Sequence, residues 1–220
     1  MPINDCSNRR NINNRQNIVE EYNLIPISHI QLLPNQTKQN CCRPALTDSY
    51  YVFSYKNKLN PNDKGYFNVG IHCANDFLRL TNKNALPIFN ILMNNNQQNN
   101  NVNNNVNNNQ QNNNLNDQRP KINIQLENAI NLFIANNDNV NLFGYLFKIL
   151  NFVRTSRAIT NNESIIEVNR VIGSYCQTIP NIINRLSIQH NNLRAFNFID
   201  LHNHIIINNI LTLDDNNLTS

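Results

Sequence analysis

The stretch from Asn94 to Asn116 consists almost entirely of asparagine and glutamine, and it limits what this chain can fold into more than any other feature. Its few apolar residues are Val102, Val106 and Leu115. Because so little apolar surface cannot offset the entropy lost on ordering, we expect a disordered linker with some tendency to β-aggregation. The linker should divide the chain into separate parts.

The sequence outside this tract separates by composition. The first forty residues are polar apart from Leu24–Leu33, which contains Pro26, so we expect an extended arm or an edge strand there. The predicted fold class is α+β, with a small hairpin-plus-helix module, a disordered Asn/Gln linker and an all-helical C-terminal part. The four predicted zones are the arm over 1–40, the module over 41–92, the linker over 93–119 and a helical bundle over 120–213.

The overall composition sets the scale and the charge of these parts. The chain has 220 residues, of which 40% are hydrophobic and 15% are charged, and this suits one or two modest domains with a real core. Asparagine makes up about a quarter of the residues, against a few per cent in an ordinary domain. The net charge of +4 permits contact with nucleic acid but is too small for a dedicated basic protein.

The cysteines and the apolar segments indicate the cellular compartment in which the protein is expected. The chain has five cysteines, an odd number, and residues 1–17 are polar without an apolar leader segment, so we expect a reducing compartment. The longest apolar stretch, Leu142–Val153, is shorter than the roughly 20 residues that a membrane helix needs. The expectation is a soluble cytoplasmic protein with no membrane partner and no small-molecule cofactor.

The compact zone has the pattern of a β-hairpin followed by a helix. Tyr50–Tyr55 is aromatic and β-branched, Asn60–Gly65 supplies turn residues, and Tyr66–Ile71 is a second candidate strand. Residues with helical spacing then follow, and the helix should end before Pro87. The expected buried face of that helix carries Ala74, Phe77, Leu78 and Thr81.

The sequence after Pro120 has the periodicity of a small helical bundle. Phe196–Leu211 is compatible with either helix or strand. The expected helices cover Ile122–Ile134, Leu142–Val153 and Ile165–Tyr175.

Local signals refine the third of these helices. Thr160 and Glu163 have the spacing of a capping box at its start. Pro180 should end or kink it, and Ile182–Leu186 should continue it. Cys176 is isolated within a helical pattern, so we expect a thiol buried in the core.

Two doublets, Cys41-Cys42 and His72-Cys73, bracket the predicted hairpin and suggest a zinc site. Structural zinc prefers thiolate and imidazole ligands, usually with one pair from a turn and one from a helix start. Cys73 falls where the helix should begin, and unpaired backbone N–H groups together with the helix dipole stabilise a thiolate at such a place.

The run from Gly65 to Ala74, followed by Phe77 and Leu78, resembles the second half of treble-clef-like zinc modules found in small bacterial and phage proteins. The similar feature is a strand-to-helix junction of the form VGxxCA after an aromatic hairpin, and it covers residues 41–87 only. The resemblance implies a structural zinc ion in a small module and says nothing about the rest of the chain.

The first doublet departs from that family, which places a CxxC knuckle where this chain has adjacent cysteines. Neighbouring side chains point in different directions, so we expect one of the two to bind and the other to pack. His72 is the natural third ligand, and the fourth position stays open among Asp76, Cys6 and His29. The alternative is a module without metal, in which the cysteines are small buried hydrophobes.

A second group of possible ligands lies near the C-terminus. Asp200, His202 and His204 alternate with other residues, so on a strand they would share one face. No second cluster stands at a defined spacing from them, and we expect a solvated turn or helix surface instead.

Basic residues accompany aromatic ones in the compact zone, as on surfaces that grip phosphates and stack bases. In the ordinary alternative, the aromatic residues form the hairpin core and the charges solvate its outside. With only four glycines, the chain has no Gly-rich phosphate loop, and no nucleophile stands in a recognisable catalytic context. The candidate contacts to nucleic acid are Arg43, Lys56, Lys58, Lys64 and Arg79.

The sequence therefore favours a non-enzymatic, zinc-stapled binding protein that contacts nucleic acid through the hairpin module, with protein partners for the helical part. The main alternative is a protein–protein adaptor or toxin-like effector in which zinc only holds the fold together. A third possibility is a metal-dependent nuclease that uses His72 or the pair His202 and His204.

Overall fold

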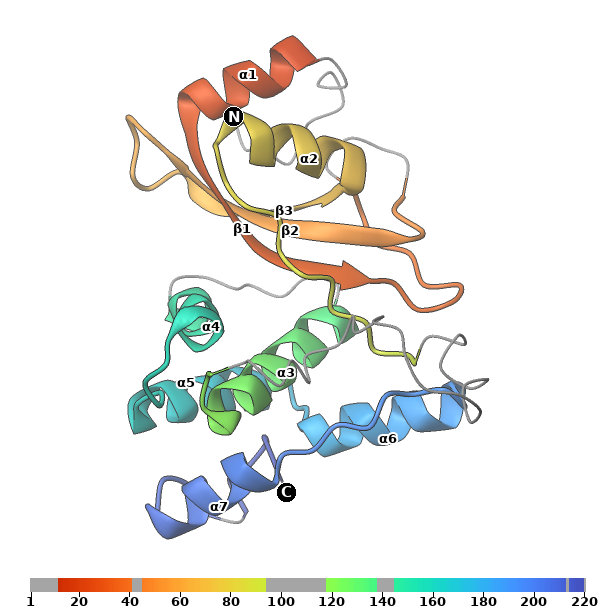
Figure 1. The fold of residues 1–220 in the computed structure, drawn as a ribbon, viewed down its shortest axis with the longest axis vertical. Helices are drawn as coiled ribbons and strands as arrows, with labels where there is room; N and C mark the ends of the chain where they lie inside the picture. Colours follow the sequence, from red (N-terminus) through yellow and green to blue (C-terminus); the bar gives the residue numbers. More distant parts are fainter. Residues whose placement is uncertain (1–11, 41–44, 94–117, 138–144, 213, 220) are drawn as a thin grey trace. The chain divides into compact units, whose positions relative to one another are not determined.

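The computed structural model describes residues 12–40, 45–93, 118–137, 145–212 and 214–219. Within them lie one three-stranded antiparallel sheet and seven helices, so the predicted α+β class is confirmed (Figure 1). Nearly all of the predicted linker lies outside the described residues, as do Cys6, Cys41, Cys42 and Arg43. The chain divides into two compact units, one of residues 1–90 with 134–147 and the other of residues 91–133 with 148–220.

The first unit contains a helix, three strands and a second helix. The strands are antiparallel neighbours in the order β1-β2-β3, so β2 is central and β1 and β3 are edges. Both helices lie on the same face of this sheet (Figure 1). The elements are α1 (Ile12–Glu21), β1 (Tyr22–Gln31), β2 (Ser49–Asn57), β3 (Lys64–Gly70) and α2 (Ile71–Leu80).

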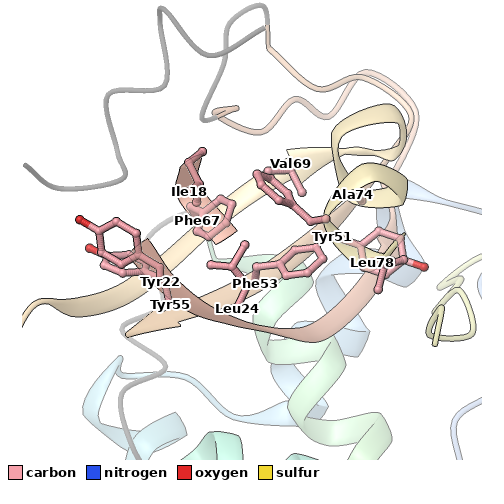
Figure 2. Packing of buried hydrophobic residues seen from close by; sticks show 11 residues of the cluster. Ile18, Tyr22, Leu24, Tyr51, Phe53, Tyr55, Phe67, Val69, Ala74 and Leu78 are labelled. Atoms are coloured by element: carbon pink, nitrogen blue, oxygen red, sulfur yellow. The ribbon is translucent and has the colours of Figure 1, made fainter. Parts of the chain in front are cut away.

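The apolar core of the first unit lies between the sheet and these two helices. Successive side chains of a strand point to opposite faces, so Tyr51, Phe53 and Tyr55 of β2 all point toward the helices. The ring of the fully buried Phe53 stacks on that of Phe67, with 5.9 Å between centroids. The core, shown in Figure 2, consists of Ile18, Tyr22, Leu24, Tyr51, Phe53, Tyr55, Phe67, Val69, Ala74, Phe77 and Leu78.

A register shift after Pro26 changes which residues of β1 face the helices. Before the shift Leu24 lies opposite Tyr55, and after it His29 lies opposite Tyr51. Proline has no N–H to donate to a neighbouring strand, so an edge strand with an irregularity is where it is tolerated. The shift brings a histidine into a line of residues that is otherwise apolar or aromatic.

The predicted hairpin and its helix are confirmed by β2, β3 and α2, and β1 confirms an edge strand within the N-terminal segment. The expectation of an extended arm is wrong for α1, which is a helix. Its sequence is rich in asparagine, a poor helix former, so its local pattern does not predict it. Ile18 is buried in the core and Arg15 forms an ion pair with Asp76 of α2, and these distant contacts stabilise the helix.

The described residues after the predicted linker contain five helices, and the predicted helical character of the C-terminal part is confirmed. Phe196–Leu211, which was compatible with helix or strand, contains a helix. The elements are α3 (Lys121–Asn136), α4 (Tyr145–Thr155), α5 (Asn162–Ser174), α6 (Ile179–Gln189) and α7 (Ile199–Ile207).

The predicted boundaries of α5 are wrong at both ends. Its N-cap is Asn161, whose side-chain oxygen accepts from the Ser164 N–H at 2.9 Å, so Thr160 does not cap it. The helix ends at Ser174, and Pro180 lies in the first turn of the separate helix α6. Proline is tolerated there because an N–H in the first turn has no helical partner in any case.

Buried polar side chains on α3 hold other segments of the second unit in place. Each binds backbone or charged groups outside α3, and burial without such partners would be costly. The pairs join Asn123 to Ala158 and Thr160, Gln125 to Asp200 and Leu201, and Glu127 to Arg119 and Arg154, at distances of 2.7 to 2.9 Å.

Candidate functional site

The first turn of α2 holds two of the four predicted zinc ligands, His72 and Cys73. The N-cap, Gly70, makes no side-chain capping bond, so the first N–H groups of the helix are not taken by a capping side chain. Such a helix start stabilises a nearby thiolate. Cys73 is half-buried and packs against the apolar core, which also fits the alternative of a small hydrophobe.

The residues on either side of the first doublet lie beside the strand that leads into α2. The backbones of Lys38 and Leu46 exchange two hydrogen bonds of 3.1 and 2.9 Å. Gln39 O accepts from Asn68 Nδ2 of β3 at 3.5 Å. An added Cβ at Gly70 would lie 3.0 Å from Leu46 Cδ2. Both ends of this segment therefore lie beside the last residues of β3.

Among the residues that the structure describes, no three His, Cys, Asp or Glu side chains lie close enough to hold a metal ion. Because Cys41 and Cys42 are outside that set, the four-residue zinc site stays a prediction. Asp76, one possible fourth ligand, forms ion pairs with Arg15 and Arg79.

His29, another possible fourth ligand, has one ring nitrogen engaged and the other buried. The Leu86 carbonyl can only accept, so His29 Nδ1 carries the proton and donates to it at 3.2 Å. His29 Nε2 is then a bare acceptor, and no group in the described chain donates to it. Burial lowers the pKa of this imidazole, and the Leu86 carbonyl and Asp48 only partly oppose the shift.

Lys56 and Lys64 lie directly opposite each other on neighbouring strands. Asn23 of β1 lies opposite Lys56 on its other side, so the three exposed residues form a row across the sheet. Because Tyr55 points toward the helices, its neighbour Lys56 and this row point away from them. Two lysines in opposed positions repel each other, and the row therefore favours the binding of an anion.

The carboxylates at this end of the hairpin are held toward the helix side of the sheet. Tyr22 Oη donates to Asp63 Oδ2 at 3.0 Å, and Asn57 Nδ2 donates to Glu21 Oε1 at 3.2 Å. Burial raises the pKa of Tyr22 to about 12, and both carboxylates add to the shift, so the phenol stays a donor. These hydrogen bonds keep the two carboxylates away from the lysine row on the opposite face.

The other predicted basic contacts are distributed differently. Lys58 directly follows β2, is exposed, and its Nζ donates to Val19 O at 2.8 Å. Arg79 lies on α2, on the helix side of the sheet, and its Nη2 is 3.5 Å from Asp76 Oδ1. The structure therefore brings Lys56, Lys58 and Lys64 to one end of the hairpin and leaves Arg79 in the helix layer, while Arg43 lies outside the described residues.

The loop between β2 and β3 is built on the side chain of Asn57. Its Oδ1 accepts from the N–H groups of Leu59 and Asn60, at 2.9 and 3.0 Å. Leu59 is 94% exposed, which is the highest value for a large hydrophobic residue in the described chain. The sequence pattern predicts turn residues from Asn60 onward and gives no role to Leu59. The available signal was a single leucine flanked by lysine and asparagine in a turn-rich stretch.

The aromatic residues of the hairpin are mostly unavailable for stacking on bases. Tyr50, Tyr51, Phe53 and Tyr55 are all buried, so the ordinary alternative, in which they form the interior, is confirmed for these four. Tyr66 is half-buried, and its ring lies 6.0 Å from that of Phe147.

The carboxylate-x-His-x-His residues lie on the helix α7, where alternate residues do not share a face. His202 Nδ1 is 2.9 Å from Thr219 Oγ1, and Asp200 accepts from Gln125. The expectation of a helix surface is confirmed. Cys176 is exposed, so the predicted buried thiol is wrong, because α5 ends just before it.

Comparison with protein-family models, with curated proteins and with solved structures finds no match to this chain. Within the described residues, no helix has the length and apolar character that crossing a membrane requires.

Proposed function

We propose that this protein is a non-enzymatic nucleic-acid-binding protein whose first unit grips the phosphate backbone with Lys56, Lys58 and Lys64. The opposed pair Lys56 and Lys64 carries the argument, because like charges in that position are destabilising until an anion lies between them. Since most hairpin aromatics are buried, they do not stack on bases, and the lysines contact phosphates. Binding should then depend strongly on salt and weakly on sequence.

The experiment is a titration of a fluorescent duplex and a single strand of mixed sequence with the full chain, followed by anisotropy at several salt concentrations. The logarithm of Kd should vary linearly with that of salt, with a slope of about 0.9 per phosphate neutralised on a duplex. The double variant Lys56→Glu, Lys64→Glu should weaken binding at least about tenfold. The double variant Lys83→Glu, Lys121→Glu makes the same charge change at two exposed sites outside the hairpin and is the control. Equal losses in both would contradict a specific lysine row.

We also propose that a structural zinc ion staples this unit, with Cys73, His72 and one of Cys41 and Cys42 as ligands. The support is the anchoring of the segment around the first doublet. Gln39, two residues before Cys41, accepts from Asn68 of β3. Leu46, four residues after Cys42, lies beside Gly70, so the described residues on both sides of the doublet lie beside the end of β3. The ion would help to close a small unit around its helix start.

The zinc proposal is tested by measuring the metal content of the purified full chain by mass spectrometry. The wild type should carry one zinc ion per chain, and Cys73→Ser should lose it. Cys176→Ser, at an exposed cysteine of the second unit, is the matched control and should keep the metal. As a second measurement, a chelator should lower the melting temperature of the wild type. A wild type without zinc, or with a melting temperature indifferent to the chelator, would contradict the proposal.

A further inference from the structure

Leu59 stands out among the apolar residues of the first unit. It is 94% exposed, whereas the next most exposed large hydrophobic residue of the strands, Ile25, is 45% exposed. The loop that carries it projects beyond the end of the sheet (Figure 1). A leucine in that position adds nothing to the core, because burial of apolar surface is what stabilises a folded unit.

Hydrogen bonds hold the backbone of the loop, although its tip is exposed. The Asn57 side chain binds the N–H groups of Leu59 and Asn60, and Asp63 N–H donates to Asn60 O at 3.0 Å. Asn57 N–H donates to Asp63 O at 2.8 Å and closes the base of the loop. Asn57 itself is buried and bound to Glu21. The backbone of Leu59 is thus held in place, so little backbone entropy remains to be lost on contact with a partner.

Three lysines lie near this leucine, while the nearby carboxylates Glu21 and Asp63 are bound by Asn57 and Tyr22 on the helix side of the sheet. Lys58 precedes it directly, and Lys56 and Lys64 lie opposite each other at the base of the loop, all three exposed. A partner that fits has an apolar layer behind an anionic surface. Duplex nucleic acid has this construction, since its bases stack behind two rows of phosphates, and an inserted apolar side chain can part a base step and kink the helix.

We infer that Leu59 is a wedge that enters the minor groove of a duplex and parts a base step while the three lysines hold the flanking phosphates. The inference rests on the proposed function and names duplex nucleic acid as the substrate class of that surface. A lipid surface is the poorer fit, because even one acyl chain gives only marginal membrane binding and a single leucine offers less.

The test uses the full chain and a short duplex with a fluorescence donor and acceptor at its two ends. Wild type should raise energy transfer by bending the duplex, Leu59→Ala should bind with the same salt dependence without raising it, and Leu59→Phe should restore it. Ile188→Ala, at a residue of α6 that is 83% exposed, is the matched control and should behave as wild type. Circular dichroism checks that the variants fold.

The possible results distinguish failure of the wedge from failure of the proposed nucleic-acid binding. If wild type and Leu59→Ala bend the duplex equally, or neither bends it while both bind, the wedge is overturned and the proposed phosphate grip stands. If no duplex or single strand is bound, the proposed function fails and the wedge with it. If vesicles of anionic lipid are bound, Leu59→Ala abolishes that binding and no bending occurs, the surface belongs to a membrane and the wedge is overturned.

Discussion

The imidazole of His29 stacks on the phenol ring of Tyr51, with 4.1 Å between centroids and 16° between planes. Both side chains donate to the carbonyl of Leu86, and Phe89 N–H donates to His29 O at 2.7 Å. The segment after α2 is therefore held on the edge of the sheet by a histidine whose neutral form is favoured by burial.

This arrangement predicts that acid weakens the first unit through His29. Its pKa is lowered in the folded chain, so below the ordinary value near 6.5 the unfolded chain binds the proton more readily. Stability should be full above that value and should fall as the pH drops toward the lowered pKa, by at most about 1.4 kcal/mol per pH unit. Urea denaturation at a series of pH values, from about one unit above the ordinary histidine pKa downward, measures this change in the free energy of unfolding. In His29→Phe the slope over this window should be smaller than in wild type, and parallel curves would contradict the prediction.

Phe53 should be the most sensitive position of the sheet. It is fully buried on the central strand, and its ring packs against those of Tyr51, Phe67 and Phe77. Phe53→Ala should lower the free energy of unfolding by about 3–5 kcal/mol through lost burial and the cavity left behind. Ser54→Ala, at the next residue on the opposite face, should change it by less than about 0.5 kcal/mol. Tyrosine fluorescence during urea denaturation reports both, since the chain has no tryptophan.

Substitution of Asn123 should lower the free energy of unfolding strongly, although asparagine is the commonest residue of the chain. It is completely buried, its Nδ2 donates to Ala158 O at 2.8 Å, and its Oδ1 accepts from Thr160 N–H at 2.9 Å. Asn123→Ala leaves both backbone groups without these bonds and should cost about 3 kcal/mol. Asn151→Ala, on the exposed side of α4, should be neutral or stabilising, because alanine is the better helix former. Thermal denaturation followed by circular dichroism compares them, and similar melting temperatures would contradict the assignment.

Substitutions of the neighbouring residues Thr160 and Asn161, at the start of α5, should have opposite effects on stability. Asn161 caps the helix, so Asn161→Ala should cost about 1 kcal/mol. Thr160 is buried, and its hydroxyl has no hydrogen-bond partner in the described chain. Thr160→Val keeps the shape and removes that polar atom, so it should be neutral or stabilising. The same melting experiment decides, and a loss at Thr160 larger than at Asn161 would restore the capping box.

The candidate site was only partly predictable from the sequence. Local patterns indicated a hairpin with lysines near its turn, because strand alternation and turn residues act over a few positions. They did not show that Lys56 and Lys64 lie opposite each other, nor that Tyr22 holds Asp63 on the other face across 41 positions of sequence. Register and side-chain partners depend on contacts between segments, which periodicity does not record.

The α+β class, the hairpin with α2 and the helical character of the C-terminal part could be predicted from the sequence, since each follows from apolar residues repeating at the period of its own element. Three other features could not be predicted without the folded chain: that 12–21 is a helix, that Asn161 and not Thr160 caps α5, and which asparagines are buried. Those outcomes depend on Ile18, Arg15 and Asn123 meeting partners far along the chain. An asparagine amide is normally solvated by water. When buried, it stabilises the fold only where other segments supply both a donor and an acceptor for it.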